Sequence, residues 1–373
     1  MNDRPLRVLV AGTSFGRRYV DALRLAPDEF RLVGLLAGGS AYSERYAKQI
    51  GVPLYTSLDA VDTEVDLAAV VLRSAVTGGP GGDIAAELLR RGVPVLQEHP
   101  VHTREISACA RVARDRGVPY AVNTLYPDIA AVRRFLDATA RLRESGDLRF
   151  WDAAANSQVL LPLLDVLGRA TGGLRPWAFD VAEVGPDLAR CASTPRPFRV
   201  VQAVIGGVPG VLRIQNQVQP DDPDNHAYLM HRVEVGTEDG VLSLAETHGP
   251  VLWNRRMHVP RDGDHRLRVD DPVVEVPVVE PVGAVDQASY REVFARQWPE
   301  AILSTLREVV AARTDTEARR RQVGWALEVA TAWQALSAKL GVPELIAPMR
   351  QPRLSAGQLA GGGGPEGRPA AHS

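Results

Sequence analysis

The sequence contains 373 residues, more than one compact domain usually holds, so we expect two domains with a cleft between them. Apolar residues make up 45% and charged residues 24%, which is typical of a globular protein and argues against wholesale disorder. With a net charge of −2, the chain lacks the positive surplus that binding to nucleic acid requires. No apolar run is long enough for a membrane helix and no signal-like segment follows Met1, so we expect a cytoplasmic protein without a membrane partner.

Cysteine and lysine are scarce, which limits the chemistry that we expect. Cys109 and Cys191 stand far apart and match neither a zinc cluster nor a disulfide framework, so we expect both in the core. The only lysines are Lys48, in a polar helix-like stretch, and Lys339, near the end of a predicted helix. Neither context suits a general base or a Schiff-base amine.

The first third of the chain alternates between short apolar strands and helix-period stretches, with helices predicted at 17–25 and 104–116. Strands without polar alternation, separated by helices, indicate a parallel sheet that is covered on both faces. Such a sheet binds ligands beyond the carboxyl ends of its strands. Residues 1–126 are therefore predicted to form a nucleotide-binding domain. Its strands are expected at 6–10, 31–36, 67–72, 93–97 and 119–122.

After about Val200 the pattern changes to longer strand-like runs with hairpin signals, which favours an antiparallel sheet. Two helices with apolar residues at three- and four-residue spacing follow, at 292–312 and 316–340. We expect residues 127–350 to form an α+β domain and the aperiodic, partly glycine-rich residues 351–373 to form a disordered tail. The predicted strands are 200–205, 210–218, 228–235, 240–244 and 272–281.

The turn after the first strand, residues 11–16 (AGTSFG), approximates the G-x-G-x-x-G fingerprint of dinucleotide-binding sites. Aligned on the last glycine, the other two glycine positions hold alanine and threonine, so a plain strand-to-helix turn is the alternative. Its place at a helix N-terminus, where backbone amides are free, favours phosphate binding. The predicted cofactor contacts in this turn are Gly12, Thr13, Ser14, Phe15 and Gly16.

The end of the second strand indicates which dinucleotide is bound. An acidic residue there would bond the ribose 2′-hydroxyl of NAD and repel the extra phosphate of NADP, and none is present. The neutral residues 37–40 (AGGS) are followed by Ser43 and Arg45, which can donate to a phosphate. We predict NADPH, with a solvated helix position as the alternative for Arg45. The further predicted cofactor contacts are Gly39, Ser40, Ser43, Arg45, Arg73, Ser74 and Glu98.

Two side chains that can donate a proton, a histidine and a tyrosine, follow neighbouring strands. His99 follows the fourth strand in the segment QEHP (97–100), and Tyr126 follows the fifth. In a parallel sheet both would stand on the rim where the nicotinamide is expected. An imidazole titrates near neutral pH and a phenol can also give a proton, so both are candidate general acids. The alternative for each is a structural side chain.

Other features receive plainer interpretations. His226 and His231 lie outside zinc-binding spacing, so no metal site is predicted. Residues 221–224 (DDPD) are expected to form a solvated turn. Trp177 and Phe179 are assigned either to the core or to the substrate cleft. The glycine-rich residues 78–82 are either a flexible cover over the cofactor or a plain loop.

With these elements in place, the chain resembles the Gfo/Idh/MocA oxidoreductase superfamily, which joins a Rossmann half, an apolar strand ending in Glu-x-Pro and an antiparallel second half. Most members carry Glu-Lys-Pro where this sequence has EHP at 98–100, and an expected Asp followed four residues later by His is missing near 156–165. These departures are similar to one branch, the thiazolinyl imine reductases of siderophore biosynthesis. The matching strings are AGTSFGR (11–17), LAGGS (36–40), VLQEHPVH (95–102), VNTLYP (122–127), QVL (158–160) and PWAF (176–179).

The resemblance implies an α/β Rossmann domain followed by an α+β domain with an open, mainly antiparallel sheet that also forms a homodimer face. It implies NADPH-dependent reduction of a thiazoline C=N bond to a thiazolidine, with the substrate held on a carrier domain of a nonribosomal peptide synthetase. It also implies His99 and Tyr126 as proton donors. Hydride addition to C=N leaves negative charge on nitrogen, so this reaction needs an acid rather than a base.

Three questions stay open at this point. Which of His99 and Tyr126 gives the proton is not decided by the sequence. An NADP-dependent sugar or cyclitol dehydrogenase of the same fold is one alternative, in which His99 takes the role of the missing lysine. A non-catalytic protein that binds a nucleotide as a sensor is the other.

Overall fold

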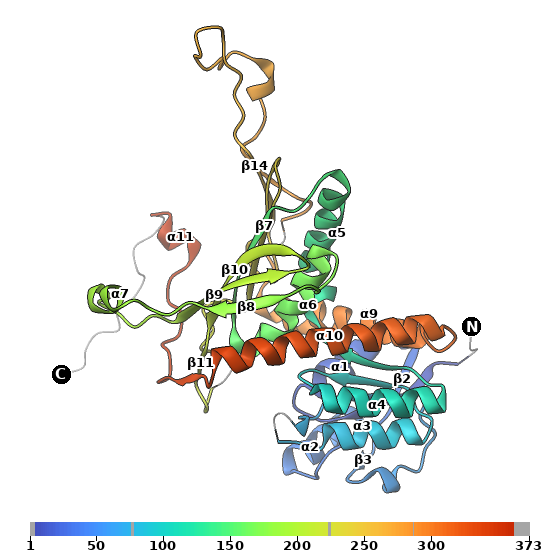
Figure 1. Cartoon of the computed structure of the whole chain (residues 1–373). Helices are drawn as coiled ribbons and strands as arrows, with labels where there is room; N and C mark the ends of the chain where they lie inside the picture. Colours follow the sequence, from blue (N-terminus) through green and yellow to red (C-terminus); the bar gives the residue numbers. More distant parts are fainter. Residues whose placement is uncertain (1–3, 76–77, 223–224, 286, 362–373) are drawn as a thin grey trace, which may run out of the picture.

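The computed structural model describes residues 4–75, 78–222, 225–285 and 287–361, which form two large sheets with helices packed around and between them (Figure 1). A third, two-stranded sheet pairs Gln217–Val218 with Glu344–Leu345. Helix α10 (Thr316–Leu340) runs between the two halves and contacts strand β6 on one side and helix α6 on the other. Helix α9 (Trp298–Ala311) returns to pack on α1 (Gly16–Leu25) in the first half. The C-terminal helices therefore join the two sheets into one structure.

The first sheet is parallel, with six strands in the order β3-β2-β1-β4-β5-β6. Its apolar side chains are buried against α1 and α9 on one face and against α3 (Gly81–Arg90) and α4 (Thr103–Arg116) on the other. The predicted doubly covered parallel sheet is confirmed. The strands are β1 (Leu6–Ala11), β2 (Phe30–Leu36), β3 (Leu54–Tyr55), β4 (Leu67–Val70), β5 (Val95–Glu98) and β6 (Tyr120–Asn123).

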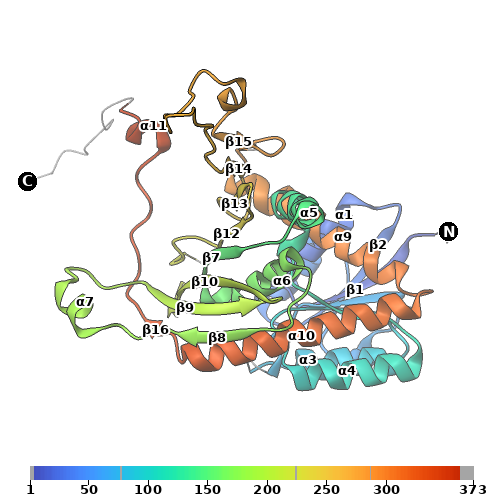
Figure 2. The ribbon, with the colours of Figure 1, turned by 45° about the horizontal axis from the view of Figure 1, so that its top comes forward.

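The second sheet has eight strands in the order β15-β14-β13-β12-β7-β10-β9-β8, and helices α5 (Ala130–Ser145) and α6 (Leu160–Thr171) pack on one of its faces (Figure 2). All neighbours are antiparallel except β7 and β10, so the prediction of a mainly antiparallel sheet is confirmed. The strands are β7 (Phe150–Asn156), β8 (Ala178–Val181), β9 (Phe198–Ile205), β10 (Val208–Gln215), β12 (His231–Gly236), β13 (Gly240–Leu244), β14 (Val251–Arg255) and β15 (Val279–Pro281).

Strand boundaries in this half depart from the prediction in three places. The strand predicted at 272–281 is wrong over most of its length, because only 279–281 pairs and Pro272–Val274 is a 3-10 turn. Three prolines in that run remove the backbone donors that a strand needs. The run at 228–235 pairs only from His231 onward, and 210–218 divides into β10 and the short β11 (Gln217–Val218). Strands β7, β8 and β14 were not predicted.

The helices follow the prediction more closely. The helix predicted at 316–340 is confirmed as α10. The helix predicted at 292–312 begins with a short turn, α8 (Tyr290–Glu292), and a π-helical turn, Val293–Gln297, before α9. Within the predicted tail, α11 (Ala356–Leu359) is exposed, and residues 362–373 lie outside the described residues. No helix in the described ranges combines the length and the apolar character that crossing a bilayer requires.

One cysteine assignment is wrong. Cys109 is buried in α4 as predicted, but Cys191 is exposed. It ends α7 (Pro186–Cys191), a helix without buried residues that stands out from the sheet between β8 and β9. A short helix in such an excursion has no core to enter, so its apolar residues stay at the surface.

Candidate active site

The turn after β1 has the shape that a dinucleotide needs. Gly12 has a φ of +111°, and a Cβ atom there would lie 2.2 Å from the backbone oxygen of Val71, so a side chain does not fit. Helix α1 begins at Gly16 with no acidic residue in its first turn, which leaves its N-terminal amides available to an anion. Thr13 is buried and Ser14 is exposed beside this turn. The predicted phosphate-binding turn therefore fits the pyrophosphate of a dinucleotide.

Serines connect this turn to helix α2 (Ala41–Ile50), which follows β2. The Ser40 hydroxyl caps α2 by accepting a hydrogen bond from the backbone N–H of Ser43, at 3.2 Å. The Ser43 hydroxyl is buried and lies 2.8 Å from Thr13 Oγ1 and 3.0 Å from Ser40 Oγ. The structure thus places Ser43 as the link between the two loops that would hold the adenosine half of the cofactor.

Two arginines stand at this edge. Arg45 is exposed on α2. Arg17, for which the sequence suggested only a helix position, donates to the Tyr42 hydroxyl at 2.9 Å and lies 5.8 Å from the centroid of the Tyr46 ring. Because α1 and α2 start at the same edge of the sheet, Arg17 is a second cation beside the N-terminus of α2. The position of Arg17 in the sequence did not predict this contact with α2.

The loop after β4 is partly fixed by packing. The Ser74 side chain is buried, and its hydroxyl donates to the backbone oxygen of Pro100 at 2.6 Å, whereas Arg73 is exposed. Of the glycine-rich residues 78–82, the last two form the first turn of α3. A Cβ atom on Gly81 would lie 2.6 Å from the backbone oxygen of Leu72, so that glycine serves packing. Residues 76–77 lie outside the described residues.

Four side chains meet at the carboxyl ends of β5 and β6. Glu98 and Asn123 are partners in register on these strands. Glu98 Oε2 accepts hydrogen bonds from the hydroxyl of Tyr19, on α1, and from Asn123 Nδ2, the latter at 3.2 Å. Asn123 Nδ2 also donates to the Tyr19 oxygen at 2.7 Å. The other carboxyl oxygen, Glu98 Oε1, lies 3.5 Å from His99 Nε2.

Burial sets the protonation of this cluster. Removal from water raises the pKa of Glu98 to about 8, although the bonds from Tyr19 and Asn123 oppose the rise. Burial lowers the pKa of His99 to about 4, with a smaller lowering by His231. At neutral pH the carboxyl group is therefore largely protonated and the imidazole is neutral. In the described chain His99 Nδ1 is buried without a hydrogen-bond partner.

Tyr126 stands in a short 3-10 turn after β6, Tyr126–Asp128, and its ring is packed between two aromatic neighbours. Its centroid lies 4.7 Å from that of His231, with planes at 78°, and 6.3 Å from that of Trp298, with planes at 77°. Trp298 in turn lies 5.7 Å from Phe15 of the phosphate-binding turn. This packing joins Tyr126 to the same rim as the cofactor-binding turn.

His231 belongs to this cluster, although the sequence suggested only a structural position beside a strand. It begins β12, and its Nε2 lies 2.9 Å from the backbone oxygen of Val159, which can only accept. Its Nδ1 lies 3.1 Å from the Thr247 hydroxyl, which can donate to it, so the neutral ring carries its proton on Nε2. Burial lowers the pKa of His231 to about 4. The contact with Tyr126 arises between domains, where no sequence spacing could indicate it.

The remaining candidates lie apart from the rim. His226 is buried and bonded to the backbone oxygen of Gln217, at 2.9 Å from Nε2. Within the described ranges, no three side chains of metal-binding type gather into a site. Trp177 and Phe179 stack with centroids 5.4 Å apart, and Phe179 is buried in the core, which confirms the core alternative for Phe179. Residues 223–224 of the predicted acidic turn lie outside the described residues.

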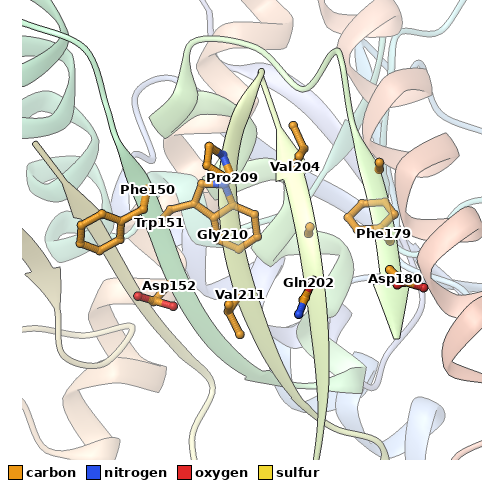
Figure 3. A pocket seen from close by; sticks show the side chains of 12 residues that line it. Phe150, Trp151, Asp152, Phe179, Asp180, Gln202, Val204, Pro209, Gly210 and Val211 are labelled. Carbon is orange, nitrogen blue, oxygen red and sulfur yellow. The ribbon is translucent and has the colours of Figure 1, made fainter. Parts of the chain in front are cut away.

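A hollow of about 640 Å³ lies on the second sheet, and Phe179 is among the side chains that line it (Figure 3). It spans strands β7, β10, β9 and β8. Its lining includes no residue predicted to bind the cofactor or to give a proton. We therefore treat it as a surface separate from the candidate active site. The side chains labelled there include Phe150, Asp152, Gln202, Val211 and Asp180.

Two family models match the chain. Residues 6–124 match the oxidoreductase family with an NAD-binding Rossmann fold (Gfo/Idh/MocA), which together with the fold and the glycine turn defines an NAD(P)-binding oxidoreductase. Residues 148–254 match the C-terminal domain of thiazolinyl imine reductases of the Irp3-like type. Residues 6–124 are thus similar to the Rossmann domain of Gfo/Idh/MocA oxidoreductases, and residues 148–254 to the second domain of Irp3-like reductases.

Solved structures share the fold over most of the chain at low identity. The WlbA dehydrogenase from Bordetella pertussis, in complex with NADH and UDP-GlcNAcA, is 13% identical with a TM-score of 0.63, covering 91% of this chain and 96% of its own. The 3-ketoreductase KijD10 from Actinomadura kijaniata, in complex with NADP and TDP-benzene, is 16% identical with a TM-score of 0.62, covering 92% and 100%. A comparison with curated proteins found no match.

Proposed function

We propose that the protein is an NADPH-dependent reductase that converts a thiazoline C=N bond to a thiazolidine while a carrier domain of a nonribosomal peptide synthetase holds the substrate. The observation that carries this proposal is the cluster of proton donors at the rim of the first sheet. Glu98 Oε1 lies 3.5 Å from His99 Nε2, and His231 connects this pair to Tyr126, because it packs on the Tyr126 ring and lowers the pKa of His99. The match of the second domain to the Irp3-like family supports the same reaction class.

The chemistry of C=N reduction suits this rim. When bound, the reduced nicotinamide would supply a hydride to the carbon of the C=N bond. The nitrogen then becomes strongly basic, so a weak acid within about 3 Å suffices to protonate it. Tyr126 offers a phenol, and His99 offers a neutral imidazole whose Nδ1 has no partner in the described chain. Closed packing around both rings would keep water from competing for the proton.

Alcohol oxidation fits the rim less well, because it needs a group that accepts a proton. Lys48 and Lys339 are both exposed, on α2 and in the last turn of α10. The lowered pKa values of His99 and His231 make both imidazoles weak bases, and the raised pKa of Glu98 keeps that carboxyl group protonated. These properties favour reduction over the sugar dehydrogenase alternative.

The edge of the cofactor site supports a preference for NADPH. The end of β2 carries no acidic side chain, and Arg17 and Arg45 stand at the start of α1 and within α2. A guanidinium can donate two parallel hydrogen bonds to one phosphate, so these arginines would favour the 2′-phosphate of NADPH. Ser40 and Ser43 hold the intervening loop in place.

We also propose that the open face of the second sheet joins two copies of the chain. Asp152 and Glu234 lie directly opposite each other on β7 and β12, where like charges repel. Arg213 and Arg232 both lie opposite Ala154, one step further along the same face. Within the described chain none of these four charges is in an ion pair. A copy related by a two-fold axis would set the acidic row against the basic row.

Exposed apolar side chains on segments that extend from that sheet also support a dimer. Leu188 on α7, with 66% of its surface exposed, and Met257, with 83%, stand on segments that reach beyond the sheet. Both views show α7 and α11 on the side away from α5 and α6 (Figures 1 and 2). Apolar residues on such extensions are typical of contacts with another subunit.

A turnover assay tests the proposed reaction. A soluble 2-aryl-thiazoline-4-carboxyl thioester that mimics the carrier-bound substrate is mixed with the protein and NADPH, and NADPH absorbance is followed. We expect consumption of NADPH and formation of the thiazolidine, with slower turnover when NADH replaces NADPH. Oxidation of inositol or glucose with NADP⁺ at a comparable rate, without thiazoline reduction, would support the dehydrogenase alternative and overturn the proposal.

A further inference from the structure

We propose that Glu98 resupplies His99 during turnover: while His99 Nδ1–H gives its proton to the substrate nitrogen, Glu98 Oε1–H gives its proton to His99 Nε2. This inference rests on the proposed function, because it assumes a substrate nitrogen that takes up a proton. It assigns to Glu98 a part in proton delivery in place of a contact with the cofactor alone.

The hydrogen bonds of Glu98 decide where its proton resides. Oε2 accepts from both Tyr19 and Asn123, so its lone pairs are engaged and both partners already donate. A proton on the carboxyl group must therefore sit on Oε1, the atom that lies 3.5 Å from His99 Nε2. This distance is long for a hydrogen bond, as catalytic contacts often are before the substrate binds.

The position of that proton fixes the tautomer of His99. If Oε1–H donates to Nε2, then Nε2 is the acceptor and the imidazole proton is on Nδ1. Nδ1 is the atom that is buried without a partner in the described chain. A buried N–H without a partner is costly, so such an atom is expected to have a ligand to bond. The three groups Glu98 Oε1, His99 Nε2 and His99 Nδ1 then form one line of proton transfer.

The surroundings of the pair favour neutral partners over an ion pair. The side chains of Glu98 and His99 are 11% and 13% exposed. Burial raises the pKa of Glu98 and lowers that of His99, so the proton resides on the carboxyl group at neutral pH. His231 on β12 lowers the pKa of His99, whereas Asp165 on α6 raises it. A neutral imidazole gives up its N–H only if the other nitrogen receives a proton, which Glu98 provides.

The steps balance in atoms and charge. The substrate carbon gains the hydride, the N–H bond at His99 Nδ1 breaks as the substrate nitrogen gains that proton, and the O–H bond of Glu98 breaks as Nε2 gains its proton. The carboxylate that remains is held by the two donors on Oε2, from Tyr19 and Asn123. After the product leaves, water gives a proton to His99 Nδ1. His99 Nε2 then gives its proton back to Glu98 Oε1.

Glu98→Gln tests the relay with little change in shape. The amide oxygen can still accept from Tyr19 and Asn123, and the amide nitrogen can still donate to His99 Nε2, so the tautomer is kept and proton transfer is lost. We expect kcat for thiazoline reduction to fall by about 10²-fold or more, with KM values for NADPH and substrate nearly unchanged. The matched control is Glu246→Gln, because Glu246 also bonds a histidine, His248, at 3.1 Å. It should keep kcat within about twofold.

An infrared spectrum provides a readout that needs neither substrate nor cofactor. At neutral pH the wild-type protein should show a carbonyl band of a protonated buried carboxyl group that is absent from Glu98→Gln and present in Glu246→Gln. A missing band, or wild-type kcat in Glu98→Gln, would overturn the relay. If the band is present but no thiazoline is reduced, the proposed function has failed rather than the placement of the proton. If thiazoline is reduced equally well by Glu98→Gln, only the relay has failed.

Discussion

Tyr126 and His231 come from different domains and pack edge to face, with ring centroids 4.7 Å apart. Tyr126 follows the last strand of the Rossmann sheet, and His231 begins a central strand of the second sheet. The contact therefore requires both domains to be docked correctly. It brings beside Tyr126 an imidazole whose pKa is lowered to about 4 by burial, so that this ring is neutral at physiological pH.

The two candidate acids should be separable by substitution. Tyr126→Phe keeps the packing against His231 and removes the phenol, whereas His99→Ala removes the imidazole. We expect the double variant to lose about 10²- to 10⁴-fold in kcat, because a general acid contributes about that much. Steady-state kinetics with NADPH and a thiazoline thioester measure the effect. Turnover within a few-fold of wild type in the double variant would exclude both side chains as donors.

Gly12 should not accept a side chain. At φ +111°, a Cβ atom would lie 2.2 Å from the Val71 oxygen, so Gly12→Ala must shift the loop that holds the pyrophosphate. We expect NADPH affinity to fall about tenfold or more and the free energy of unfolding to fall by about 1–3 kcal/mol. Gly146→Ala is the control, because nothing lies within 4 Å of its Cβ position and it stands after α5, outside the cofactor-binding loops. Fluorescence titration with NADPH distinguishes them, and equal affinities would contradict the assigned turn.

Arg17 and Arg45 should set the preference between the two dinucleotides. Loss of a guanidinium that contacts the 2′-phosphate weakens NADPH binding by about tenfold and leaves NADH binding unchanged. We expect this result for Arg17→Ala and Arg45→Ala, measured as KM for each cofactor. Arg24→Ala, at the other end of α1, is the control, since it should alter neither KM. If KM rose equally for NADPH and NADH, the arginines would not contact the 2′-phosphate.

The buried carboxyl group of Glu98 should make stability depend on pH. Its pKa is about 8 in the folded protein and near 4.5 when it is unfolded, so the folded state holds the proton more tightly. This contribution is fully present below about pH 4.5 and is lost as the pH rises through about 8. Urea unfolding of wild type and Glu98→Gln should therefore show a difference in free energy that falls over that interval. A constant difference would mean that Glu98 is ionised in the folded state.

Charge reversal should break the proposed dimer. With Arg213 and Arg232 both changed to Glu, the face would carry only acidic side chains beside Asp152 and Glu234, and two copies would repel. Light scattering coupled to size exclusion should give a monomer for this variant and a dimer for wild type. Adding Asp152→Arg and Glu234→Arg should restore the dimer. A wild-type monomer at about 10 µM, roughly the range of a specific contact, would contradict the assignment.

Much of the first domain could be predicted because local sequence determines it. Short apolar runs, each followed by a turn and a helix, can bury both faces only in a covered parallel sheet, and this places Glu98, His99 and Tyr126 on one rim. The second domain was harder to predict. Strand β7 contains three consecutive alanines, 153–155, which have low strand propensity, and it forms because its neighbours in the sheet pair with it.

The missed site residues share one property, which is that their partners are distant in the sequence. Tyr19 lies in what reads as an ordinary helix, yet its hydroxyl reaches Glu98, 79 positions away. His231 reaches Tyr126 from another domain, and Arg17 reaches Tyr42 across two loops. Spacing along the chain reports contacts within one element or one turn, so these three contacts become evident only when the elements are packed.

The most direct measurement is the fate of a deuterium carried by the cofactor. A 2-aryl-thiazoline thioester is incubated with the protein and NADPH deuterated at C4 of the nicotinamide, and the product is analysed by mass spectrometry. We expect a thiazolidine that carries one deuterium at the carbon of the former C=N bond and one exchangeable hydrogen on the adjacent nitrogen. An unchanged thiazoline, with NADPH intact under conditions where the protein binds it, would contradict the account.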